Sequence, residues 1–165
     1  TTALAAGVYA VLLGVGSARG ATDPLHPLAP AAPASLVFTP VASLAELYRG
    51  VSTAQAAGRT VMLDFYADWC VSCKEMERYT FSDPQVRAML ARMTLLRADV
   101  TANNENDQAL LRHFGIFGPP TLAFYGADGR ERRSYRVVGY MKAPAFIAAL
   151  TQVMAPASPS PEPLR

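Results

Sequence analysis

Between residues 36 and 154, short apolar runs alternate with segments in which apolar residues recur every three or four positions. Consecutive apolar residues over four to eight positions are typical of buried strands, whereas the longer period indicates amphipathic helices. The short runs predict strands at residues 36–41, 60–66, 94–100, 121–125 and 135–139. The periodic segments predict helices at residues 43–58, 70–79, 83–93, 105–114 and from about 142 onward. The last helix carries three apolar residues on one face, namely Phe146, Ile147 and Leu150.

Local signals support several of these bounds. Ser43 and Glu46 have the spacing of a capping box at the start of the first helix. Asp83 is placed as an N-cap residue, and Pro84 then occupies the first helical position, where proline is favoured. Because Pro40 has no N–H to donate to a sheet, the first strand should end there or lie at an edge.

The order of the elements favours an α/β fold with a central mixed sheet flanked by helices. Early alternation of strands and helices implies parallel strands joined by right-handed crossovers. The last two strands are separated by the turn-forming residues 126–129, so we expect them to form a hairpin. Functional residues in open α/β sheets gather at the carboxyl ends of strands. Trp69 and Cys70 lie just beyond such an end.

The N-terminal segment is almost wholly apolar. Sixteen residues, 3–18, precede Arg19, which is fewer than the roughly 20 that span a bilayer. Three interpretations compete. A signal peptide would need a positively charged start. A buried core helix would be separated from any core by the proline-rich segment that follows, and the third interpretation is the end of a transmembrane helix. We favour the transmembrane end for residues 1–19.

Two proline-rich stretches frame the foldable part of the chain. They hold eight of its thirteen prolines. Residues 20–35, rich in proline and alanine, are predicted to form a semi-rigid linker, and residues 155–165 a disordered tail. One domain, at residues 36–154, remains between them.

Composition narrows the function classes. A chain of 165 residues with 51% hydrophobic residues can bury the core of one domain, and a formal charge of +2 gives no reason to expect nucleic-acid binding. The basic residues gather only after the predicted turn, and we interpret them as a solvated hairpin edge. They are Arg130, Arg132, Arg133 and Arg136.

The two cysteines of the chain, Cys70 and Cys73, carry the most informative pattern. Two intervening residues allow their thiols to form a disulfide reversibly, and the start of a helix favours a thiolate at Cys70. As a structural staple the pair would contribute little, since a four-residue loop gives only about 2 kcal/mol. As a zinc site it lacks ligands, because beyond the pair only His26 and His113 are suitable. Redox chemistry is the favoured interpretation.

Two acidic residues could tune this pair. Asp64 lies within an apolar strand, a costly place for an unpaired carboxylate, and we interpret it as a buried acid that exchanges protons with the cysteines. The alternative is a hydrogen-bonded structural aspartate. Glu77 follows Cys73 by four positions and would lie on the same helical face, although a solvated glutamate has the same spacing.

The surrounding charges favour a reductant. Four carboxylates lie near the pair in sequence, at Asp64, Asp68, Glu75 and Glu77, with Lys74 and Arg78 as the expected opposing cations. Like charge and desolvation both disfavour a thiolate. A pair whose thiolate is not strongly stabilised tends to give electrons rather than take them. Trp69 is interpreted either as a core or rim aromatic or as an apolar surface on which a partner docks.

Trp69, the cysteine pair, Lys74 and a later proline–threonine pair together resemble the thioredoxin superfamily over about residues 36–153. The resemblance implies a thioredoxin fold with Cys70 as the attacking thiol and Cys73 as the resolving one. It also implies that Asp64 is the buried acid and that the Pro119–Pro120 bond is cis and faces the thiols. From sequence alone, that dipeptide predicts only a turn.

Residues 61–77, 79–86 and 100–103 more narrowly resemble the C-terminal domain of the DsbD family of thiol:disulfide interchange proteins. This implies a periplasmic domain tethered to the bacterial inner membrane. It would take electrons from a cysteine pair of its own transmembrane domain and pass them to its N-terminal periplasmic domain. Disulfide isomerases and cytochrome c maturation proteins would receive them next.

The resemblance also assigns site residues. Asp64 and Glu77 match the acidic residues that tune the attacking cysteine, and no metal or organic cofactor is implied. Gly118 and Pro119 depart from the family, in which an aliphatic residue more often precedes the cis-proline.

Two other functions remain open at this stage. One is a membrane-tethered thioredoxin-like reductase dedicated to cytochrome c maturation, which would have a single transmembrane helix. The other is a non-catalytic interaction module, for which replacement of Cys70 by serine would leave function intact.

Overall fold

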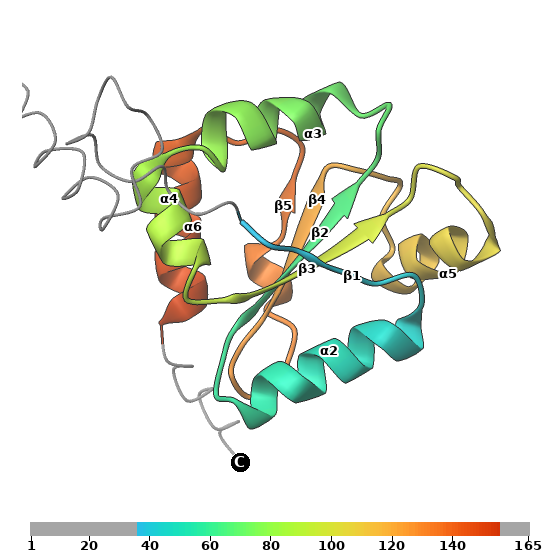
Figure 1. Cartoon of the computed structure of the whole chain (residues 1–165), viewed down its shortest axis with the longest axis horizontal. Coiled ribbons are helices and arrows are strands. Elements are labelled where there is room, and N and C mark those ends of the chain that lie inside the picture. The colour runs from blue at the N-terminus through green and yellow to red at the C-terminus, as the bar shows by residue number, and fades with distance from the viewer. Residues whose placement is uncertain (1–35, 156–165) are drawn as a thin grey trace, which may run out of the picture. The chain divides into compact units, whose positions relative to one another are not determined.

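The computed structural model describes residues 36–155, which form a five-stranded mixed sheet with helices on both faces (Figure 1). The strand order is β1-β3-β2-β4-β5. The strands are β1 (Thr39–Pro40), β2 (Val61–Tyr66), β3 (Thr94–Asp99), β4 (Thr121–Tyr125) and β5 (Val137–Val138). The helices are α2 (Leu44–Ala56), α3 (Val71–Glu75), α4 (Pro84–Leu90), α5 (Glu105–Phe114) and α6 (Ala143–Met154). The expected α/β fold with a central mixed sheet is confirmed.

The pairing of the strands follows the expected topology. β3 pairs in parallel with both β1 and β2, whereas β4 is antiparallel to β2 and β5 is antiparallel to β4. β1 lies at the edge of the sheet, as Pro40 predicts, although it is shorter than the expected strand. β2 lies at the centre and is buried along its whole length.

Alternate residues of the central strands bury into two cores, one on each face of the sheet. Leu63 and Phe65 of β2 pack on the face covered by α2 and α5, where Phe65 makes an edge contact with Phe114. Met62 packs on the opposite face with Phe146 and Leu150 of α6. Asp64 shares the direction of Met62, because side chains two apart on a strand point to the same face.

The helix expected at residues 70–79 changes its character partway. α3 is α-helical only to Glu75, and Met76–Thr80 continue it as a π-helical turn. Such turns are rare and are often found at functional sites. The sequence-based expectation of one regular helix was therefore wrong in its second half.

The predicted caps are found, with one shift. Ser43 accepts a hydrogen bond from the amide of Glu46, but the carboxylate of Glu46 reaches back to the amide of Ala42. Asp83 accepts from two amides in the first turn of α4, as predicted.

The hairpin after β4 differs from the prediction. Only Val137–Val138 form a strand, because Arg133–Tyr135 form a 3₁₀ turn before it. Arg136 lies 2.5 Å from Glu131 and donates a 2.6 Å hydrogen bond to the carbonyl of Phe114. This arginine is mostly buried, so the basic residues do not form a wholly solvated edge.

Within the part of the chain that the structure describes, no helix combines the length and the apolar character needed to span a bilayer. The predicted transmembrane end at residues 1–19 and the linker at residues 20–35 lie outside the described residues, as does the predicted tail beyond residue 155.

Candidate redox site

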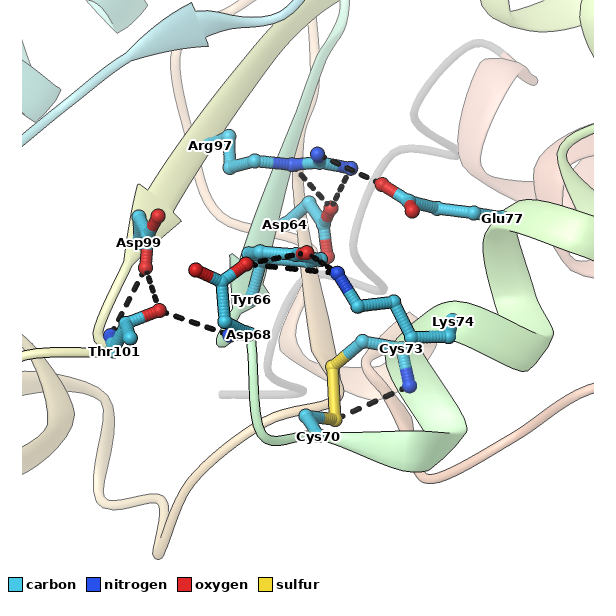
Figure 2. A network of polar contacts seen from close by, with 10 residues as sticks. All are labelled: Asp64, Tyr66, Asp68, Cys70, Cys73, Lys74, Glu77, Arg97, Asp99 and Thr101. Atoms are coloured by element: carbon cyan, nitrogen blue, oxygen red, sulfur yellow. Dashed lines mark hydrogen bonds and ion pairs between the residues drawn. A yellow bond between two sulfur atoms is a disulfide. The ribbon is translucent and has the colours of Figure 1, made fainter.

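The two cysteines form a disulfide at the start of α3, just beyond the end of β2 (Figure 2). Their Cα atoms are 5.3 Å apart. Cys70 is the N-cap residue, and its Sγ accepts a 3.1 Å hydrogen bond from the amide of Cys73. Both residues are buried, with exposed fractions of 6% for Cys70 and 3% for Cys73. The pair therefore lies where the sequence placed it, with the first sulfur at a helix start.

A groove beside the disulfide is lined mainly by apolar side chains and by glycine. It has a volume of about 380 Å³ and is formed by Trp69, Phe117, Gly118, Pro119, Pro120, Val138 and Gly139. The Pro119–Pro120 peptide bond is cis, as the resemblance implies. The expected pair of prolines and Trp69 thus line one surface. Trp69 keeps 60% of its surface exposed, which fits the rim interpretation rather than the core one.

Asp64 is buried in β2 and is ion-paired with a residue that the sequence analysis did not single out. Arg97 of β3 is its direct neighbour across the sheet, and Nη2 of Arg97 lies 2.8 Å from Oδ2 of Asp64. Nε of Arg97 donates a 3.0 Å hydrogen bond to the same oxygen.

Burial raises the pKa of Asp64 from 3.8 to about 6, although the guanidinium of Arg97 opposes the rise. Glu77 adds a smaller upward contribution to the pKa. A carboxyl group with this pKa changes its protonation state just below neutral pH, so Asp64 can take up or release a proton there.

Glu77 joins the same cluster from the π-helical turn. Its Oε1 lies 2.9 Å from Nη1 of Arg97, so one guanidinium bridges Glu77 and Asp64 (Figure 2). The structure therefore brings together the two acids that the sequence nominated. It does so through Arg97, and the expectation that Lys74 and Arg78 are the opposing cations was incomplete.

A second polar chain runs beside Lys74. The hydroxyl of Tyr66 donates a 3.0 Å hydrogen bond to Asp68 and accepts one from the ammonium of Lys74. The hydrogen bond to Tyr66 raises the pKa of Lys74 above its usual value. Lys74 also lies 3.5 Å from Asp68, and both side chains are largely exposed. Asp68 is therefore paired with a cation rather than left as an uncompensated charge near the disulfide.

Arg97 was missed because its partner lies 33 residues away in sequence. The available signal was an arginine flanked by Leu96 and Ala98 within a predicted strand. A buried cation needs an anion, and Asp64 is the acid placed within a neighbouring apolar strand. Only the register of the two strands makes them direct neighbours.

Comparisons with known proteins agree with this geometry. Residues 47–154 match the family model of the thioredoxin-like domain. The chain is 49% identical over 156 residues to the thiol:disulfide interchange protein DsbD of Ralstonia nicotianae, covering 89% of this chain and 26% of that protein. It is 53% identical over 119 residues to DsbD of Salmonella typhi, covering 72% of this chain and 21% of that protein. The chain thus spans about a quarter of the length of these curated relatives.

Solved structures give the same result. The reduced C-terminal domain of DsbD from Neisseria meningitidis is 39% identical, with a TM-score of 0.60, and the match covers 68% of this chain and 97% of that domain. Its oxidised form has the same identity and TM-score, with 70% and 99% covered. A thioredoxin from Thermus thermophilus is 30% identical, with a TM-score of 0.54, over 64% of this chain and 81% of that one.

Proposed function

Because this chain belongs to the thioredoxin-like family and corresponds to the C-terminal domain of the thiol:disulfide interchange protein DsbD, we propose that it relays electrons by thiol–disulfide exchange at Cys70 and Cys73. The observation that supports this most directly is a disulfide at a helix start, beside an exposed apolar groove with a cis-proline. A partner can dock on that groove while its own sulfur reaches the pair.

The exchange takes place in two half-reactions. In the first, a thiolate of the electron donor attacks the disulfide and forms a mixed disulfide. The donor's second thiolate then attacks the donor sulfur of that mixed disulfide and displaces the cysteine bound to it. The donor leaves with a disulfide, and Cys70 and Cys73 take up two protons to become thiols. In the second, the Cys70 thiolate attacks a disulfide of the acceptor. That attack displaces one sulfur of the acceptor and leaves a mixed disulfide between Cys70 and the other. Cys73 then attacks the sulfur of Cys70 and displaces the acceptor's second sulfur, so the acceptor leaves with two thiols and the Cys70–Cys73 disulfide is regenerated.

We assign the attacking role to Cys70. The hydrogen bond from the Cys73 amide to its sulfur would stabilise a thiolate there. Cys73 is the more buried of the two and lies within the helix, as suits a resolving thiol.

Asp64 and Glu77 are proposed to tune this chemistry. A thiol that becomes a thiolate must lose its proton, and Asp64 has a pKa of about 6, close enough to neutral pH to participate in that transfer. Negative charge on these acids also disfavours a stable thiolate at Cys70. This supports a role of the cysteine pair as reductant rather than oxidant. Trp69, Pro119 and Pro120 are proposed to contact the partner.

The wider role is proposed from the relatives. The donor would be a cysteine pair in the protein's own transmembrane domain, and the acceptor its N-terminal periplasmic domain. Disulfide isomerases and cytochrome c maturation proteins would be supplied indirectly. In this arrangement residues 1–19 are the end of a transmembrane helix at the bacterial inner membrane. Residues 20–35 are a linker, residues 36–154 the periplasmic domain, and residues 155–165 a tail.

The function is tested with the purified chain after reduction by dithiothreitol and removal of that reagent. We expect it to reduce a protein disulfide such as that of insulin, with two thiols lost from the chain per disulfide reduced. Cys70→Ser should abolish the reaction, whereas Cys73→Ser should accumulate a mixed disulfide that dithiothreitol releases. Full activity in Cys70→Ser would instead support a non-catalytic interaction module.

A further inference from the structure

Arg97 occupies the centre of the acidic cluster. We propose that Arg97 is a positioning residue that holds the carboxylates of Asp64 and Glu77 together beside the redox helix and favours the ionised form of Asp64 while the cysteines exchange. This inference deepens the proposed function and rests on it. Arg97, a residue of β3, contacts both acids and would control their arrangement (Figure 2).

All three nitrogens of the Arg97 guanidinium lie close to a carboxylate oxygen. Nε and Nη2 face one carboxylate oxygen of Asp64 at 3.0 and 2.8 Å, and Nη1 faces Glu77 at 2.9 Å. A planar fork can serve two anions at once in this way, whereas the point charge of a lysine cannot. The two acids come from different elements, β2 and the π-helical turn, so Arg97 also links that turn to the sheet.

The guanidinium is held in place by more than charge. Its central carbon lies 4.1 Å from the ring centre of Phe38 and 4.5 Å from that of Tyr66. Only 20% of the Arg97 side chain is exposed. Its main chain is paired with Pro40 on one side and with Asp64 on the other. A side chain packed in this way keeps its position, unlike an exposed arginine that samples many rotamers.

The charged groups around Asp64, Glu77 and Arg97 determine what the loss of Arg97 would change. Arg97 faces Asp64 from β3, and Glu77 faces Arg97 from the π-helical turn. Lys74 of α3 lies 3.5 Å from Asp68, which follows β2, and also interacts with the charge of Glu77.

With both acids ionised, the cluster of Asp64, Glu77 and Arg97 has a net charge of about −1. Without Arg97 that charge would be about −2, unless Asp64 kept its proton to a higher pH. The first consequence changes the net charge next to the redox pair, and the second changes the protonation state of Asp64. At a pH high enough to ionise both acids, the extra negative charge would also disfavour the Cys70 thiolate.

The test is a carboxyl-carbon NMR titration of Asp64 in the full chain, with Arg97→Gln as the main variant. We expect the Asp64 midpoint to rise by about 1–3 pH units, the amount by which a close opposite charge lowers a carboxyl pKa. In Arg97→Lys the midpoint should lie between those of the wild type and Arg97→Gln. Above that raised midpoint, where both acids are ionised, the alkylation profile of Cys70 in the reduced chain should lie at higher pH in Arg97→Gln than in the wild type.

Two further variants separate this role from general stability. Arg136→Gln removes another mostly buried arginine–glutamate pair and should leave both titrations unchanged. Glu77→Gln removes a like charge and should lower the Asp64 midpoint, a result that remains available if Arg97→Gln does not fold.

An Asp64 midpoint that does not move in folded Arg97→Gln would overturn the assignment. If Arg97→Gln does not fold, an unmoved Asp64 midpoint in Glu77→Gln would overturn it. Failure of the reduced wild-type chain to reduce a protein disulfide is a separate result. It would overturn the proposed function while leaving the carboxyl titration as measured.

Discussion

The amide of Cys73 donates a 3.1 Å hydrogen bond to Sγ of Cys70. This contact favours negative charge on the first sulfur, whereas burial of both residues opposes it. In the proposed function, the protonation state of Asp64 and Glu77, which Arg97 joins, adjusts the reactivity of Cys70 further. The predictions for Asp64 follow from this coupling.

Replacement of Asp64 by asparagine should lower the pKa of Cys70. The wild-type carboxyl group is ionised above pH 6 and repels a developing thiolate, whereas asparagine keeps a similar shape and can still accept a hydrogen bond from Arg97. We expect a decrease of about 1 pH unit, the lower end of the shift that a close charge causes. Thiolate absorbance of the reduced chain measures it. An unchanged or raised Cys70 pKa would refute the coupling.

The same substitution should change how stability depends on pH. In the folded chain the pKa of Asp64 is about 6, against 3.8 for the ordinary carboxyl group. An acid with a raised folded pKa contributes most favourably below pH 4, and this contribution is lost as the pH rises through 6. At about 1.4 kcal/mol per unit of pKa difference, the loss is at most roughly 3 kcal/mol.

Urea unfolding of the oxidised chain at pH 4 and pH 7 measures this loss. Because other carboxyl groups also titrate, the informative quantity is the difference between wild type and Asp64→Asn. We expect wild type to lose more stability than the variant between the two pH values. Parallel losses would show that the pKa of Asp64 is not raised by folding.

The sequence predicted most elements that depend on local patterns. The buried central strand was placed to within one residue, and α5 matched at both ends, at Glu105 and Phe114. The cysteine pair could be placed at a helix start because the apolar run ends just before it. Each of these features depends on residues that are close together in the chain.

Features that depend on distant residues were not predicted. The π-helical turn at Met76–Thr80 has no pattern of its own, since its residues suit a regular helix equally well. Arg97 became part of the site only through the pairing of β2 with β3. Arg136 was interpreted as solvated because its partners, Glu131 and the carbonyl of Phe114, are brought to it by the folding of the hairpin.

The N-cap of α5 provides a test of stability away from the redox site. Asn104 accepts hydrogen bonds from the amides of Asn106 and Asp107, and the carboxylate of Asp107 accepts one from the amide of Asn104. Loss of an N-cap side chain costs about 1 kcal/mol. Asn104→Ala should therefore lower the free energy of unfolding by about that amount, measured with urea. The rate of thiol–disulfide exchange at low temperature should be unchanged. A large loss of thiol–disulfide exchange activity in the folded variant would contradict a purely structural role for Asn104.

Replacement of Trp69 by alanine should distinguish docking from chemistry. Trp69 borders the apolar groove, is 60% exposed and donates a 3.2 Å hydrogen bond to the carbonyl of Thr101. An exposed aromatic side chain contributes more to an interface than to the core, and removal of an interface anchor typically costs about 2 kcal/mol or more. We therefore expect the reduced Trp69→Ala chain to reduce a protein disulfide at least about tenfold more slowly.

The control for this experiment is a small disulfide that does not occupy the groove, such as a short aromatic disulfide. Its reduction rate should change less than about twofold, because the Cys70 sulfur and the Cys73 amide that stabilises it are unaltered. Tyr48→Ala, on α2, removes another half-exposed aromatic side chain and should leave both rates unchanged. Equal slowing with both substrates in Trp69→Ala would assign Trp69 to the reactivity of the cysteines rather than to recognition of the partner.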